Sequence, residues 1–311
     1  LRLLFWLHNV AEGLRLESLW HHSGDMAGVL DAILVAGGLG TRMLPASASI
    51  AKEALPLVDI PVLTHLAREA VAAGAKRLHI VTSARKDLSA LLADNSWLLS
   101  KRSDLDPLVL SPFSDVEVLV HIQHQALGLA NAISAASASI NGPFLVLLGD
   151  NLLMNNHTTA SDYSPSNASA ELVKCYAVNN LPCVGLVSVA DDEVSNYGVV
   201  EMDGQHITSI VEKPNKVDAP SNMVLCGRYI FTEDFSQLLN QYDLATHGEL
   251  QSIAIQQHWM DNCGLIGVPL DGYQWYDSGS PLPWLKSQID HALRRPDMNQ
   301  QLRDWLIQRL Q

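Results

Sequence analysis

Two basic side chains near the start of the chain, Arg42 and Lys52, have the type and spacing to hold phosphate groups. Arg42 ends the glycine-rich segment Ala36-Gly37-Gly38-Leu39-Gly40-Thr41-Arg42, and Lys52 begins Lys-Glu-Ala-Leu-Pro-Leu. A guanidinium group binds two phosphate oxygens at once, whereas an ammonium group acts as a point charge. Glycines let the backbone approach a phosphate or a base edge, where N–H groups become donors. The two motifs together indicate phosphoryl-group chemistry.

The glycine-rich segment fits neither of the two common phosphate-binding loops. A dinucleotide-binding loop needs G-x-G-x-x-G, but the sixth position counted from Gly38 is Met43. A Walker A loop needs Gly-Lys-Ser/Thr, but Gly40 is followed by Thr41 and Arg42. An NAD-dependent dehydrogenase is therefore disfavoured. Taken alone, the segment could still be a tight strand-to-helix turn with a solvated arginine.

Two aspartates far apart in the sequence, Asp150 and Asp277, each follow a run of strand-forming residues. A carboxylate at the carboxyl end of a buried parallel strand points into the ligand crevice of an α/β sheet. Mg²⁺ prefers oxygen ligands and usually takes one or two carboxylates together with phosphate oxygens. The pair therefore suggests a Mg²⁺ site, although either aspartate alone could equally cap a helix or a turn.

The sequences of the two basic motifs resemble those of one protein family. The patterns G-G-x-G-T-R-x-x-P at residues 37–45 and K-E-x-L-P-L-x-D-x-P at residues 52–61 are similar to the opening of the sugar-1-phosphate nucleotidyltransferases. Later motifs resemble the bacterial UTP–glucose-1-phosphate uridylyltransferases within that family, from about Ala32 to Gln288. The resemblance implies transfer of a uridylyl group from UTP to glucose 1-phosphate, with release of pyrophosphate.

The resemblance also implies a role for each matching residue. The expected catalytic cations are Arg42 and Lys52, on the triphosphate tail, and Lys213, on the sugar phosphate. The expected nucleotide-binding residues are Ala36, Gly37, Gly38, Glu53, Gln123 and Gly128, with Gln123 on the uracil edge. The expected sugar-binding residues are Gly198, Glu212, Lys213 and Gly227. The expected ligands of Mg²⁺ are Asp150 and Asp277.

Several positions depart from the family pattern. The chain has Ala48 and Ala51 where the family usually has Lys and Pro, and Ala130-Asn131 where it has Gly-His. Ala254 stands in place of the Asp of a Thr-Asp pair. Two alternatives therefore remain open. One is a weakened or non-catalytic UDP-glucose-binding paralogue that regulates a homologue, and the other is a transferase for another nucleotide or sugar, such as dTTP.

Composition narrows the class of partner. The 311 residues include 33 acidic and 20 basic side chains, a formal net charge of −13. Such a chain repels nucleic acids and anionic membrane surfaces, but a local cation cluster can still bind small anions. The four cysteines form no C-x-x-C pair, which is typical of reduced thiols in a cytoplasmic protein. The family commonly forms dimers or tetramers, so we expect a homo-oligomer.

The elements that must position these residues alternate from residue 29 onwards. Strands are expected at Val29–Ala36, Arg77–Thr82, Val116–Ile122 and Pro143–Leu148, and helices at Pro61–Ala73, Lys86–Leu92 and Leu129–Ser139. The second half is more mixed, with strands at Cys183–Ala190, Tyr197–Glu201, Ile207–Glu212, Arg228–Phe231 and Leu265–Leu270, and helices at Phe235–Tyr242, Leu250–Trp259, Pro281–Arg294 and Asn299–Leu310.

This alternation predicts an α/β fold, with a Rossmann-like, mostly parallel central sheet, helices on both faces and an elaborated C-terminal half. We expect a single nucleotidyltransferase domain over residues 26–311, whose C-terminal helices begin at about residue 281. Residues 1–25 are expected to lie outside the catalytic fold, so that a chain starting at Met26 should fold and work.

Overall fold

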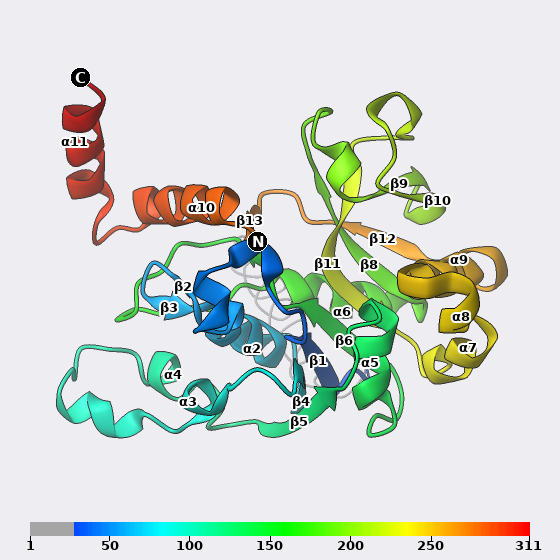
Figure 1. The fold of residues 1–311 in the computed structure, drawn as a ribbon, viewed down its shortest axis with the longest axis horizontal. Helices are drawn as coiled ribbons and strands as arrows, with labels where there is room; N and C mark the ends of the chain where they lie inside the picture. The colour runs from blue at the N-terminus through cyan, green and yellow to red at the C-terminus, as the bar shows by residue number, and fades with distance from the viewer. Residues whose placement is uncertain (1–27) are drawn as a thin grey trace, which may run out of the picture.

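The computed structural model describes residues 28–311, and the predicted extension over residues 1–25 lies outside the described residues. Its centre is a nine-stranded sheet (Figure 1). The strands are, in spatial order, β5 (Glu117–Gln123), β4 (Arg77–Ser83), β1 (Asp31–Val35), β6 (Phe144–Leu148), β11 (Met223–Phe231), β8 (Cys183–Ser188), β12 (Ile266–Pro269), β10 (His206–Glu212) and β9 (Gly198–Asp203).

The sheet joins a parallel half to a mixed half. Strands β5, β4, β1 and β6 run parallel, and the apolar runs of β1 and β6 are typical of strands buried in a parallel sheet. Strand β11 is antiparallel to both β6 and β8, and β10 is antiparallel to β9 and β12, while β8 and β12 are parallel. The α/β class is confirmed, and the antiparallel pairs belong to the elaborated C-terminal half.

Helices cover both faces of the sheet, as expected. On one face lie α2 (Val62–Ala72) and α6 (Ala168–Asn179), and on the other lie α5 (Leu129–Ser137), α7 (Phe235–Gln241) and α9 (Gln251–Asn262). Alternate side chains of β1 enter different cores. Ala32 and Leu34 belong to the core under α2 and α6, whereas Ile33 belongs to the core under α5, α7 and α9. Burial on both faces explains the apolar run of β1 from residue 32 to residue 35, and its one polar residue, Asp31, is buried but paired with Arg77.

Several short elements were not anticipated from the sequence. A ribbon pairs β7 (Asn151–Met154) with β13 (Gln274–Asp277), and a hairpin joins β2 (Pro56–Leu57) to β3 (Ile60–Pro61). The helix expected over Lys86–Leu92 is shortened to α3 (Ser89–Leu92), and the Lys86 side chain instead binds the buried Glu53. The remaining short helices are α4 (Pro107–Leu110), α8 (Leu244–His247), η1 (Thr41–Met43), η2 (Ala46–Ala48), η3 (Lys52–Ala54), η4 (Ser96–Ser100), η5 (Val194–Asn196), η6 (Lys216–Asp218) and η7 (Gly248–Leu250).

Two helices end the chain. Helix α10 (Pro281–Arg294) packs on β13 and β2, and α11 (Asn299–Leu310) extends away from the body beyond it (Figure 1). None of the residues in α11 is buried. Among residues 28–311, no helix has both the length and the apolar character needed to cross a bilayer.

Candidate active site

A cleft of about 390 Å³ brings together predicted residues from distant parts of the chain. Its walls come from the ends of β6, β9 and β10, the middle of β11 and the β7–β13 ribbon. The predicted site residues that line it are Arg42, Asp150, Gly198, Glu212, Lys213, Gly227 and Asp277.

The β7–β13 ribbon explains why Asp150 and Asp277 meet. Its register places Asp277 opposite Asn151, the residue after Asp150. The Ser278 N–H donates to the Asp150 carbonyl at 2.8 Å, which joins the backbones at the same point. Strand β6 ends just before Asp150, so this carboxylate lies at the carboxyl end of a buried parallel strand.

The charge balance at the two carboxylates favours a bound cation. Burial pushes the Asp150 pKa upward, but the charge and hydrogen bond of Lys52 outweigh burial and hold this pKa below its usual value. The pKa of Asp277 is raised, chiefly by burial and also by the negative charge of Asp150. Two carboxylates of one cleft therefore repel each other, which a divalent cation would relieve.

The donor set suits Mg²⁺ completed by substrate oxygens. Within residues 28–311, no group of three or more His, Cys, Asp or Glu side chains could hold a metal alone. Mg²⁺ does not need such a cage, since one or two carboxylates, water and phosphate oxygens satisfy it. The residues present therefore fit a Mg²⁺ ion that binds together with a phosphorylated substrate.

The two cations predicted for the triphosphate lie on either side of this pair. Lys52 Nζ is 2.7 Å from Asp150 Oδ2. Arg42 lies in η1 and is exposed, and its Nη2 is 2.9 Å from where a Cβ on Gly279 would lie. Gly279 in turn donates its N–H to Asp277 Oδ1. The guanidinium therefore covers the turn that holds the second carboxylate.

The residues predicted to bind the sugar lie together on another wall of the cleft. Glu212 and Gly198 are partners across β10 and β9, and a Cβ on Gly198 would lie 3.0 Å from Glu212 Oε2. Lys213 has a φ of 45°, which is uncommon for a residue other than glycine, and its N–H donates to the Tyr197 carbonyl at 3.0 Å. Its side chain is 63% exposed. Backbone strain of this kind is concentrated at functional sites, so Lys213 is a candidate for direct substrate contact.

Gly227 is required by a bulge in β11. The pairing of β11 with β8 shifts register between Leu225 and Tyr229, and Gly227 within the shift has a φ of 78°. A Cβ there would lie 3.1 Å from Asn151 Nδ2. The bulge therefore lets β11 approach the residue that follows Asp150.

The predicted base-binding residue Gln123 lies outside the lining of this cleft, between the glycine-rich segment and α5. Its Nε2 donates to Asn131 Oδ1 at 2.9 Å and to the Gly128 carbonyl at 3.4 Å. Its Oε1 lies so close to Gly37 that a Cβ on Gly37 would approach it to 2.5 Å. Asn131, a departure from the family pattern, thus holds the amide of Gln123.

The other predicted nucleotide residues differ in how accessible they are. Gly38 is exposed, with open space where a side chain would lie, whereas Ala36 is buried. Glu53 is wholly buried, and both of its oxygens accept from Lys86 Nζ, at 2.9 and 2.8 Å. Lys86 also donates to the Ala36 carbonyl at 2.7 Å, so it links Glu53 to the start of the glycine-rich segment, and the role of Glu53 in nucleotide binding stays a prediction.

Sequence reasoning missed the buried groups beneath the cleft. Arg228 is fully buried, pairs with Glu69 at 2.7 Å and donates to the Asn151 carbonyl at 2.9 Å. The sequence does carry a sign of this pair: Arg228 stands in an otherwise apolar strand, where an arginine needs a buried acidic partner. Lys86 gave no such signal, because it begins the helix expected over Lys86–Leu92, where a lysine ordinarily faces solvent.

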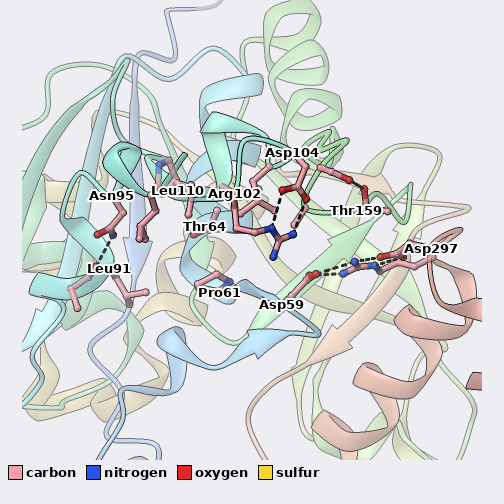
Figure 2. A pocket seen from close by; sticks show the side chains of 18 residues that line it. Asp59, Pro61, Thr64, Leu91, Asn95, Arg102, Asp104, Leu110, Thr159 and Asp297 are labelled. Carbon is pink, nitrogen blue, oxygen red and sulfur yellow. Dashed lines mark hydrogen bonds and ion pairs between the residues drawn. The ribbon is translucent and has the colours of Figure 1, made fainter. Parts of the chain in front are cut away.

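A larger cavity, of about 640 Å³, lies elsewhere, between the segment 90–112 and the N-terminal end of α2 (Figure 2). Its charged groups neutralise one another: Arg102 pairs with Asp104, and Arg295 with Asp59 and Asp297. Since both of its arginines are already paired, this cavity is poorly suited to a triphosphate. The smaller cleft remains the candidate active site.

Comparison with known families agrees with this assignment. The family described as "Nucleotidyl transferase" matches residues 31–290. The chain belongs to the nucleotidyl transferase family. It is therefore a nucleotidyltransferase enzyme, and members of this family generally use a divalent metal.

Relatives of this nucleotidyltransferase carry a consistent description. It is 30% identical to a UTP–glucose-1-phosphate uridylyltransferase of Streptococcus pneumoniae, over 90% of this chain and 96% of that protein. A UTP-bound UGPase from Acinetobacter baumannii is 28% identical, with a TM-score of 0.75 over 90% of this chain and 99% of that one. A UDP-glucose pyrophosphorylase complexed with UDP-glucose is also 28% identical, with a TM-score of 0.69 over 85% of this chain and 98% of that one.

Proposed function

We propose that this nucleotidyltransferase transfers the uridylyl group of UTP to glucose 1-phosphate, giving UDP-glucose and pyrophosphate. The observation that carries the proposal is the cleft that collects Asp150, Asp277, Arg42 and Lys213, with Lys52 bound to Asp150. The relatives described as uridylyltransferases and the UTP-bound neighbour support this choice of substrates.

The reaction needs no protein nucleophile, because the attacking phosphate oxygen is already anionic. That oxygen forms a bond to the α-phosphorus of UTP while the bond to the bridging β-phosphate oxygen breaks, and pyrophosphate leaves. The chain supplies position and charge: Lys213 holds the sugar phosphate, and Arg42 and Lys52 hold the departing pyrophosphate. Mg²⁺, when held by Asp150 and Asp277, supplies positive charge to the reacting phosphates.

The remaining proposed residues select and orient the two substrates. Gln123 offers its amide to the uracil edge, beside the backbone of Gly37, Gly38 and Gly128. Ala36 and Glu53 act through Lys86, which fixes the end of β1. Glu212 accepts hydrogen bonds from sugar hydroxyls, and Gly198 and Gly227 keep the sugar pocket free of side chains.

A panel of reactions tests the proposal. The full chain is incubated with UTP, dTTP, CTP, ATP or GTP and with glucose 1-phosphate or galactose 1-phosphate, with and without Mg²⁺, and pyrophosphate release is measured. We expect release with UTP and glucose 1-phosphate, and loss of release when a chelator removes the metal. Preference for dTTP would replace the proposed nucleotide, and no release in any combination would overturn the proposed activity.

We make a further proposal about the extent of the domain, the location of the enzyme and its oligomeric state. We propose one domain over residues 26–311, acting in the cytoplasm as a homodimer or homotetramer on small-molecule substrates, without nucleic acid or membrane partners. The exposed Trp305, Ile307 and Leu310 of α11 support self-association through this helix. Light scattering of the full chain and of a chain ending at Arg295 measures this: the truncation should lower the mass to that of a smaller assembly.

A further inference from the structure

Two of the four cysteines lie in contact on the face of the sheet covered by α6. Cys175 is in the last turns of α6, and Cys183 is the first residue of β8. The helix ends at Asn179, Asn180 adopts a left-handed conformation with a φ of 51°, and the chain turns back into the strand. The two Sγ atoms are 3.6 Å apart.

The two thiols are not equivalent. Cys175 is half-buried, whereas Cys183 is fully buried. Cys175 Sγ accepts from Asn179 Nδ2 at 3.4 Å and lies 3.6 Å from the Cys183 thiol. The one hydrogen of that thiol is shared between Cys175 Sγ and the Leu181 carbonyl, which lies 3.1 Å from Cys183 Sγ. These donors, first of all Cys183, lower the pKa of Cys175, whereas the hydrogen bond to Cys175 and burial raise the pKa of Cys183. Cys175 is therefore the accessible, more readily ionised sulfur, and Cys183 is the protected one.

We propose that Cys175 and Cys183 form a reversible oxidation site, in which a hydroperoxide converts the thiol pair to an intramolecular disulfide between α6 and β8. The site lies apart from the candidate active site and does not depend on the proposed function. The two sulfur atoms already lie 3.6 Å apart, and only seven residues separate the two cysteines in the chain.

The chemistry balances with hydrogen peroxide as the oxidant. The Cys175 thiolate attacks one peroxide oxygen, so that an S–O bond forms and the O–O bond breaks. The departing hydroxide takes a proton and becomes water, and Cys175 is left as a sulfenic acid. Cys183 Sγ then loses its proton and attacks the Cys175 sulfur; the S–S bond forms, the S–O bond breaks and a second water leaves. Two thiols have lost two electrons in total, and a dithiol reductant reverses the change.

The test uses the full chain carrying Cys263→Ser, which removes the exposed thiol that could oxidise by itself. After brief treatment with stoichiometric hydrogen peroxide, free thiols are alkylated and the chain is digested with trypsin. Cys175 and Cys183 stay on one tryptic peptide, residues 175–216, since no Lys or Arg separates them and trypsin does not cleave the Lys213–Pro214 bond. We expect that peptide unalkylated and lighter by two hydrogens, while Cys226 is alkylated. Cleavage after Tyr176 with chymotrypsin should then give two peptides joined only through sulfur.

Two single variants provide matched controls. With Cys183→Ser, Cys175 should gain oxygen atoms instead of forming a disulfide. With Cys175→Ser, the buried Cys183 should remain alkylatable after unfolding. The proposal is overturned if the two-cysteine chain gains oxygen on Cys175 as fast as the Cys183→Ser chain, or if both thiols remain reduced at peroxide levels that oxidise Cys263 in the unsubstituted chain.

Discussion

Lys52 and Asp150 are partners of each other: Nζ lies 2.7 Å from Oδ2, and the lysine side chain is only 9% exposed. In the proposed reaction Lys52 binds the leaving pyrophosphate and Asp150 binds the metal. Since an ammonium has three N–H donors, Lys52 can bind a phosphate oxygen when the substrates arrive, either beside Asp150 or in its place. Until then the pair keeps a buried carboxylate neutralised.

Replacing Lys52 by Met separates these two roles. Turnover should fall on the order of 10²- to 10³-fold, because a donor aimed at developing charge is lost. Mn²⁺, a paramagnetic stand-in for Mg²⁺, should bind the free variant more tightly, because Asp150 has lost its competing ammonium. Steady-state kinetics and electron paramagnetic resonance measure the two effects.

Asp150→Asn should abolish both metal binding and nearly all turnover while the circular dichroism spectrum is unchanged. Wild-type turnover in either variant would refute the assigned roles.

Lys213→Ala should remove nearly all turnover at ordinary substrate concentrations, and mainly raise KM for glucose 1-phosphate. The reason is that its exposed ammonium is assigned to the sugar phosphate, not to UTP. Lys216→Ala is a matched control, since Lys216 is exposed on η6 nearby in the chain. Kinetics with each substrate varied in turn distinguish the two lysines. Equal effects on the KM of UTP and of glucose 1-phosphate would contradict the assignment.

Asn131→Ala should raise the Kd of UTP by up to about tenfold, the worth of one lost hydrogen bond. The Gln123 amide loses its acceptor at 2.9 Å and is no longer held in one orientation. Asn131→Asp keeps an acceptor at the same place and should retain most of the affinity. Isothermal titration with UTP measures both variants. If the alanine variant binds UTP as the wild type does, Asn131 has no part in base recognition.

Lys86→Met should lower the free energy of unfolding by about 3–5 kcal/mol, because it leaves the carboxylate of Glu53 buried without a partner. Burial already raises the pKa of Glu53 above its usual value, and Lys86 offsets part of that penalty. The double variant Lys86→Met, Glu53→Gln should recover much of the loss. Urea denaturation compares the three chains, and equal losses in the single and double variants would count against a buried ion pair.

Stability should also fall on acidification below the ordinary histidine pKa of about 6.5. Burial, with Arg295, lowers the pKa of His65 to about 4, and burial, with the neighbouring histidines, lowers the pKa of His291 to about 3. Between these values and 6.5 the unfolded chain binds protons that the folded chain does not. Each histidine therefore contributes a loss of up to about 1.4 kcal/mol per pH unit as the pH falls.

Urea titrations at pH 7, 6 and 5 measure this slope. The free energy of unfolding of the double variant His65→Gln, His291→Gln should depend less on pH than that of the wild type. His124→Gln, at an exposed position, should keep the wild-type slope. Parallel curves for all three chains would assign the acid sensitivity to other groups.

The sequence predicts the central strands of the fold better than the short elements that position the candidate site. Strands β1 and β6 are recognisable because burial on both faces favours long apolar runs. Ribbon β7–β13 is not, since its short strands come from distant segments whose pairing no local pattern encodes. That ribbon is nevertheless what brings Asp277 beside Asp150.

The same limit explains Lys86 and Asn131. Motif positions identified the residues that meet in the cleft, because their types suit phosphates and metal. Lys86 reads locally as the first residue of an exposed helix, and only the folded chain reveals its buried carboxylate partner, Glu53. Asn131 reads as a departure from the family, and its bond to Gln123 becomes visible only when α5 packs against β5.

One preparation of the full chain tests the central claim most directly, by measuring UDP-glucose formed and pyrophosphate released from UTP, with and without glucose 1-phosphate. The account predicts that both products appear in equal amounts, only when glucose 1-phosphate and Mg²⁺ are present, and that Asp277→Asn abolishes both. Tight binding of UDP-glucose without release of pyrophosphate would contradict it, and would identify a binding protein instead of an enzyme.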